Sequence, residues 1–113
     1  MVHIALHFLV PLAVAGLAYR PRWVSAWLVL VATMLVDVDH LLASPVYDPE
    51  RCSIGFHPLH TAPAIGAYVF AFAVPLLLAW RRREGSAASW ERWLHLAGAG
   101  LLIHMVLDGL DCL

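Results

Sequence analysis

Four long runs of apolar residues, separated by short polar connectors, dominate the sequence. They cover residues 2–19, 23–43, 61–80 and 90–110, which is 18, 21, 20 and 21 residues. A helix needs about 20 residues to cross a bilayer core of roughly 30 Å, and each run is apolar around most of its circumference. The pattern therefore predicts an all-α fold, an integral membrane bundle of four transmembrane helices that forms a single domain over residues 1–113.

The composition supports a membrane environment. Hydrophobic residues make up 62% of the chain and charged residues 13%, whereas soluble domains carry about 25% charged residues. A chain of 113 residues has too little interior to bury so much apolar surface, so the lipid bilayer is the expected partner. The net charge of −1 provides no basic surface for a nucleic acid. The oligomeric state is left open.

The arginines predict the orientation. All seven basic residues are Arg, and four spanning helices would place the first and third connectors on the same side of the membrane. The positive-inside rule makes that side cytoplasmic, so both termini and the middle connector face outward. All five Trp fall near the same helix ends, as an interfacial belt would. Six arginines lie in or beside these two connectors: Arg20, Arg22, Arg81, Arg82, Arg83 and Arg92.

Ten ionisable residues are expected at the outward end of the bundle. The chain reverses direction at every connector, yet each of them maps to this one level. His95 lies about half a membrane away, where a role in helix packing is favoured. The ten residues are His3, His7, Asp37, Asp39, His40, His57, His60, His104, Asp108 and Asp111.

Their spacing favours convergence. His3 and His7, like His104 and Asp108, are separated by four residues, which places both side chains on one face of a helix. The pairs Asp37/His40, His57/His60 and Asp108/Asp111 are three apart and also share a face. Asp39 is about 200° from Asp37 on an ideal wheel, so it is expected to face a different neighbour.

The cost of these charges favours metal binding. An Asp at the centre of a membrane helix costs roughly 2.5–3.5 kcal/mol, and neighbouring carboxylates repel one another. Divalent cations would balance them, with neutral imidazole as the other ligand. Zn²⁺ suits this donor set best, with two ions as one arrangement, and Mn²⁺ or Fe²⁺ are further candidates. A structural polar network and a proton or ion pathway are the alternatives.

Two further features lie on the outward side. Cys52 and Cys112 would either form a disulfide or stay as unpaired thiols, and a cysteine ligand to the metal is a third option. Arg51 is the only Arg expected there. It would bind an anionic group of a substrate or form an ion pair with Asp48 or Glu50.

Four segments resemble a family of short, uncharacterised bacterial membrane proteins: residues 6–11, 34–42, 52–60 and 102–108. The order His, Asp-x-Asp-His, His, His-x3-Asp is also similar to YdjM-type inner-membrane metal-dependent hydrolases, which are related to zinc-dependent phospholipase C. The resemblance implies a helical fold in the bacterial inner membrane, a multinuclear zinc site and phosphodiester hydrolysis. This chain differs in having two N-terminal His and the segment Phe-His-Pro-Leu-His-Thr in place of an Arg-Gly-x-Thr-His-Ser type segment.

The first functional hypothesis is a membrane-embedded metal-dependent hydrolase of a phosphoester or phospholipid at the outer headgroup region. The metal would lower the pKa of a bound water to about 7. The remaining candidates, His3, Asp39, His57 and Asp111, would complete a second metal site or orient ligands. Asp39 or Asp111 would act as general base, and Arg51 would bind substrate. The expected metal ligands are His7, Asp37, His40, His60, His104 and Asp108.

The alternative is a non-catalytic metal-binding membrane protein for transport or sensing. A transport path should continue polar groups to the opposite side of the membrane. Below the cluster the sequence offers His95 and small residues such as Ser25 and Thr33, which disfavours a path through one monomer.

Overall fold

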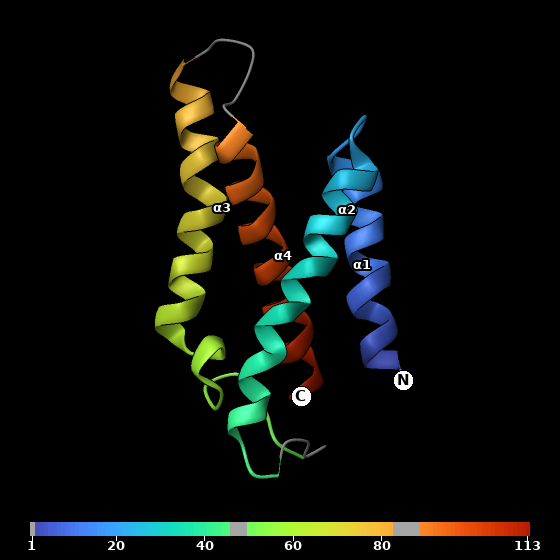
Figure 1. The fold of residues 1–113 in the computed structure, drawn as a ribbon, viewed down its shortest axis with the longest axis vertical. Helices are drawn as coiled ribbons and strands as arrows, with labels where there is room; N and C mark the ends of the chain where they lie inside the picture. Colours follow the sequence, from blue (N-terminus) through green and yellow to red (C-terminus); the bar gives the residue numbers. More distant parts are fainter. Residues whose placement is uncertain (1, 46–49, 83–88) are drawn as a thin grey trace.

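The computed structural model describes residues 2–45, 50–82 and 89–113, and these are almost entirely helical. No strand occurs in these ranges, so the predicted all-α class is confirmed. The elements are α1 (Val2–Ala18), α2 (Trp23–Ala32), the 3₁₀-helix η1 (Thr33–Leu42), the short 3₁₀-helix η2 (Pro58–His60), α3 (Ala62–Arg82) and α4 (Ser89–Asp111) (Figure 1).

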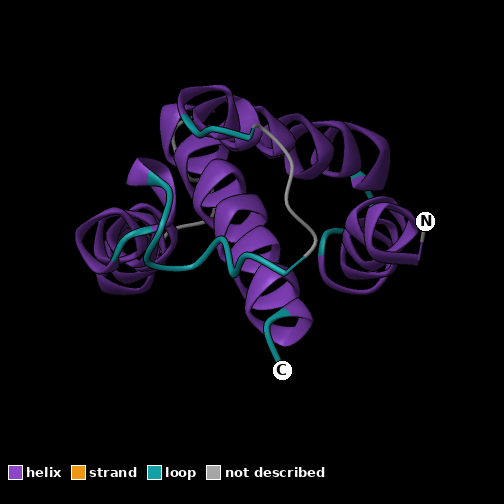
Figure 2. Ribbon diagram, turned by 90° about the horizontal axis from the view of Figure 1, so that it is seen from below, coloured by secondary structure: helices purple, strands orange, loops and turns teal. Residues whose placement is uncertain are grey.

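The helices run up and down, so that alternate connections meet at the same end. The α1–α2 turn lies at one end of the bundle, beside the end of α3 and the start of α4, and both termini lie at the other (Figure 1). Helix α3 packs mainly against α4, and α1 against α2. Helix α4 contacts α1, α2, α3 and η1, and it runs through the middle of the bundle when seen from the terminal end (Figure 2).

Three of the helical stretches are long and apolar enough to cross a membrane: Trp23–Leu42, Ala62–Arg82 and Ser89–Asp111. Helix α1 is apolar but shorter, with 17 residues, because the chain turns at Arg20 and Pro21 and Pro disfavours a helical residue before it. Large apolar side chains such as Phe70 are exposed to the surroundings. Three of the four predicted transmembrane helices therefore have the length and composition of a membrane span.

The second predicted helix is not α-helical throughout. It changes at Thr33 into the 3₁₀-helix η1, where the Thr33 hydroxyl donates to the Leu30 carbonyl at 2.5 Å. A 3₁₀-helix has three residues per turn, so side chains three apart eclipse one another. Asp37 and His40 consequently lie on one side, with 3.6 Å between Asp37 Oδ1 and His40 Nδ1.

The connector before α3 is shaped by proline and glycine. Pro58 restricts the residue before it to extended backbone, and His57 has φ −83° and ψ 145°. Gly55 has a φ of 82°, which favours glycine, and its N–H donates to the His60 carbonyl at 3.0 Å. Cys52 and Cys112 form a disulfide, so the loop is tied to the end of α4 and neither thiol is free.

Candidate metal centre

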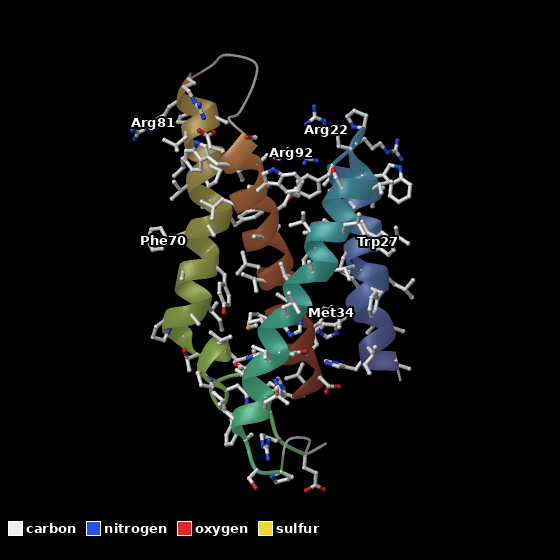
Figure 3. The ribbon with its side chains drawn as sticks, viewed as in Figure 1. Arg22, Trp27, Met34, Phe70, Arg81 and Arg92 are labelled. Carbon is white, nitrogen blue, oxygen red and sulfur yellow. A yellow bond between two sulfur atoms is a disulfide. The ribbon has the colours of Figure 1, made fainter. Side chains whose placement is uncertain are left out.

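Histidine and aspartate side chains gather at the end of the bundle that carries both termini, around and below Met34 in Figure 3. They form three groups in which every residue offers a donor atom within 4.8 Å of the others. The central group is Asp37, His60, His104 and Asp108; the second is His3, His7 and Asp108; the third is Asp39, His40 and His57.

The central group has the spacing of a tetrahedral site. Asp37 Oδ1 lies 2.9 Å from His104 Nε2 and 3.4 Å from His60 Nε2. Asp108 Oδ2 lies 3.1 Å from His60 Nε2 and 3.3 Å from His104 Nε2. Donor atoms bound to one tetrahedral Zn²⁺ are separated by about 3.3 Å, given metal–ligand distances of about 2.0–2.2 Å. Two imidazoles and two carboxylates from three segments of the chain therefore fit a single ion.

Asp108 links the first two groups. While its Oδ2 faces the central group, its Oδ1 lies 3.2 Å from both His3 Nε2 and His7 Nε2. The side chain is 5% exposed, so both oxygens face protein. A carboxylate with one oxygen toward each of two sets of imidazoles has the geometry of a bridging ligand.

The imidazoles are oriented by hydrogen bonds on the side away from Asp108. His7 Nδ1 donates to the His3 carbonyl at 2.8 Å, and His60 Nδ1 lies 3.0 Å from Asp39 Oδ2. These partners accept, so in neutral rings the lone pair is on Nε2. Both Nε2 atoms are buried and lack a hydrogen bond within the described residues. Each Nε2 lone pair points at a carboxylate oxygen, and the two electron-rich atoms repel each other. A cation bound between the nitrogen and the oxygen would remove this repulsion.

The third group surrounds Asp39, which is nearly inaccessible at 3%. Its Oδ2 accepts from the Leu59 backbone N–H at 2.8 Å and from His60, and its Oδ1 lies 3.1 Å from His40 Nδ1. His57 stacks on His40, with ring centroids 3.8 Å apart. The prediction that Asp39 faces a different neighbour from Asp37 is wrong for His40 and His60, which both carboxylates contact. The His60 ring lies between them, with Nε2 toward Asp37 and Nδ1 toward Asp39. Asp39 holds His60 in place, the arrangement typical of a carboxylate behind a metal-binding imidazole.

The same contacts shift the pKa values of His57 and His60. Burial lowers the pKa of His60, but the close carboxylates of Asp108, Asp37 and Asp39 outweigh it and raise the pKa to about 10. Burial and the neighbouring His40 lower the pKa of His57. With no cation bound, His60 holds a proton at the position where a metal would otherwise balance the carboxylates.

A pocket of about 90 Å³ opens beside the second group. Its lining includes His3, Asp108, Asp111 and Arg51, and the disulfide closes one side. Asp111 is mostly exposed, at 65%, and its Oδ2 lies 3.8 Å from His3 Nδ1. The guanidinium of Arg51 lies 4.6 Å over the Phe56 ring. Asp48, an expected partner of Arg51, is outside the described residues, as is Arg83 of the arginine run.

His95 lies apart from the three groups. Its Nδ1 donates to the Phe72 carbonyl at 2.9 Å, and its Nε2 accepts from the Tyr19 hydroxyl at 2.7 Å. Both nitrogens are therefore used in joining α1, α3 and α4, as the packing interpretation of His95 expects.

Two contributors to the centre carry no signal in the sequence. The Ser53 hydroxyl lies 3.2 Å from His40 Nε2, and the Leu59 amide bonds Asp39. A loop serine has no helical partner at a fixed spacing, and a backbone N–H is present at nearly every residue, so only the tertiary structure identifies them.

The comparison with known families gives one relationship. A family described as a family of unknown function, DUF6122, matches residues 1–81. The chain belongs to this family. The matched part holds seven of the ten clustered residues, and His104, Asp108 and Asp111 lie beyond it. No curated protein and no solved structure matches the chain, so the similarity to YdjM-type hydrolases stays a prediction.

Proposed function

We propose that this protein is a membrane-embedded, metal-dependent hydrolase of a phosphoester or phospholipid. The observation that carries the proposal is the position of Asp108, whose two oxygens face separate sets of imidazoles at 3.1–3.3 Å. Paired metal sites joined by a shared ligand are typical of enzymes that hydrolyse phosphate esters. The order of His and Asp motifs along the chain supports the same reaction class.

The membrane part of the proposal depends on surface and charge. Three helical stretches have the length and hydropathy of membrane spans, and α3 exposes Phe70 and Trp80. Among the described arginines all but Arg51 lie at the end opposite the candidate metal centre, where Figure 3 labels Arg22, Arg81 and Arg92. By the positive-inside rule this end faces the cytoplasm. The metal centre then lies at the outer headgroup level of the bacterial inner membrane.

Zn²⁺ fits the donor set best, because imidazole and carboxylate in a closely spaced tetrahedral group are its usual ligands, and Mn²⁺ or Fe²⁺ would also fit mixed sites. The central group would hold one ion, and His3, His7 and Asp108 a second. When bound, such ions polarise a phosphoryl oxygen and lower the pKa of water.

The chain's own residues divide the remaining tasks. Asp39 uses both oxygens to position His40, His60 and the Leu59 amide, so it orients ligands. Asp111 is exposed beside the pocket and is the better candidate to accept a proton. Arg51 borders the same pocket, where its guanidinium would bind a phosphate oxygen. The pocket opens beside the helix ends, so a headgroup at the bilayer surface would reach it.

The test begins with metal content. Elemental analysis of the purified wild type should find zinc, and Asp108→Asn and His60→Gln should each weaken metal binding by about tenfold or more. His95→Gln is the matched control, since it changes a half-buried histidine outside the three groups. It should keep the metal of the wild type.

Activity is measured on bis(p-nitrophenyl) phosphate and on phosphatidylglycerol in detergent. Turnover should require metal, disappear with a chelator and fall at least tenfold in Asp108→Asn, because a ligand shared by two sites is lost. Normal metal content without turnover would favour the sensing or transport alternative. Wild-type protein without metal after growth in zinc-, manganese- or iron-supplemented medium would refute both.

A further inference from the structure

A second cavity lies at the opposite end of the bundle from the metal centre. It has a volume of about 600 Å³ and is bordered by α3, α4 and the α1–α2 turn. Pro75, Leu76 and Ala79 of α3 and Trp93 of α4 form an apolar wall. This volume lies within the range of about 300–1,000 Å³ that is usual for small-molecule sites.

Two arginines from different elements border this cavity: Arg22 from the α1–α2 turn and Arg92 from α4. Figure 3 labels both at this end of the bundle. Arg92 Nη2 donates to the Ser25 hydroxyl at 3.1 Å. Among the described residues, neither arginine forms an ion pair with a carboxylate. Glu91 also borders the cavity, but it is buried and ion-paired with Arg82. The cavity therefore combines an apolar wall with two positive charges that an anion could balance.

We propose that this cavity binds an anionic phospholipid of the cytoplasmic leaflet. A guanidinium group matches the geometry of a phosphate, and charge-assisted bonds of this kind are among the strongest polar contacts. The phosphate would bind between Arg22 and Arg92, and the upper part of an acyl chain would lie against Leu76 and Ala79. Trp93, like the other Trp residues near this end, suits the headgroup level of a bilayer.

The proposal rests on the membrane part of the proposed function and is independent of the metal centre. The test uses full-length protein in detergent, freed of metal with a chelator so that no turnover intervenes. Native mass spectrometry with equal dioleoylphosphatidylglycerol and dioleoylphosphatidylcholine should show one bound phosphatidylglycerol, preferred by at least tenfold. The double variant Arg22→Gln/Arg92→Gln should lose this preference.

The control variant Arg20→Gln/Arg81→Gln removes the same charge from the same end of the bundle, outside the cavity. It should keep the preference, and an equal loss in both double variants would overturn the proposal by showing a general surface-charge effect. Ala79→Phe, which narrows the cavity without changing its charge, should also weaken phosphatidylglycerol binding. Unchanged binding in Ala79→Phe would place the lipid elsewhere.

A competition experiment distinguishes binding of a phospholipid from binding of a soluble phosphate compound. Millimolar glycerol 3-phosphate should leave bound phosphatidylglycerol in place, because it lacks the acyl chain that the apolar wall contacts. Full displacement would overturn the lipid proposal in favour of a soluble ligand. Metal content and phosphodiesterase activity, measured separately, report on the metal centre, so failure of either proposal leaves the other testable.

Discussion

Asp39, Asp108 and Asp111 carry the same side chain but lie in three different environments. Asp39 is inaccessible and its hydrogen bonds are all made within the protein. Asp108 is buried among four imidazoles, and Asp111 faces a pocket and solvent. These differences in burial, bonding partners and access are the basis for the roles proposed above: positioning for Asp39, metal binding for Asp108 and proton transfer for Asp111.

His60 gives a prediction for pH at the same scale. In the metal-free protein its pKa is raised to about 10, against about 6.5 in an unfolded chain. The stabilisation is complete below pH 6.5 and is lost as pH rises through about 10. The melting temperature of chelator-treated protein should therefore fall between pH 7 and 10, as differential scanning fluorimetry would show.

His60→Gln provides the control, because its side chain does not titrate, and its melting curve should be flatter over this range. Zinc should also flatten the curve of the wild type, since the ion replaces the proton between the same carboxylates. A chelator-treated wild type that is equally stable at pH 7 and pH 10 would contradict the prediction.

Helix α4 and the 3₁₀-helix η1 supply and position most of the side chains of the candidate metal centre. Helix α4 is the most buried helix and carries small residues where its neighbours come closest. A Cβ on Gly98 would lie 2.5 Å from the backbone nitrogen of Phe72, and one on Gly100 would lie 2.5 Å from the Thr33 hydroxyl. The close approach at Gly100 occurs where α2 changes to η1, so α4 and the tighter helix meet just before Asp37.

Gly98→Ala tests this packing. The new methyl group would meet α3 backbone, which cannot move as a flexible side chain can, so the variant should lose about 1–3 kcal/mol of stability. Gly66→Ala is the matched control, since a Cβ there meets nothing within 4 Å and alanine favours the helix. Thermal unfolding in detergent measures both, and equal stability of the two variants would contradict the packing argument.

The whole molecule has two chemically different ends. The candidate metal centre, both termini and the disulfide lie at one end, and the arginine-bearing helix ends and the larger cavity lie at the other (Figures 1 and 3). The bundle extends 49 Å along its longest axis, so the two ends would contact opposite headgroup layers if it spans a bilayer. The disulfide ties the loop to the end of α4 beside the small pocket.

The orientation proposed from this polarity is testable with engineered cysteines. The native cysteines are paired, so Ser44→Cys at the metal end and Ser89→Cys at the arginine end each add one reactive thiol. In intact spheroplasts an impermeant maleimide should label Ser44→Cys and leave Ser89→Cys unlabelled until the membrane is permeabilised. The reverse pattern would place the metal centre in the cytoplasm.

The sequence by itself determined the helical class and the level at which the ionisable residues meet. Long apolar runs can satisfy their backbone in a membrane only as helices or closed barrels, and their length and alternating direction bring His3, Asp37, His60 and Asp108 to one end. These features depend on helix geometry and chain reversal, which local sequence fixes.

Only the tertiary structure decided how nine of the ten residues divide into groups and that Asp111 lies outside them. His40, expected with the central ligands, lies with Asp39 and His57. Its Nδ1 is closer to Asp39 Oδ1, at 3.1 Å, than to Asp37 Oδ1, at 3.6 Å, and its ring stacks on His57. The bridging position of Asp108 and the pairing of Cys52 with Cys112 also depend on how α4 packs against α1 and the loop. Contacts between residues this far apart in the sequence, 60 positions for the disulfide, arise from the packing of whole helices, and no local pattern in the sequence encodes that packing.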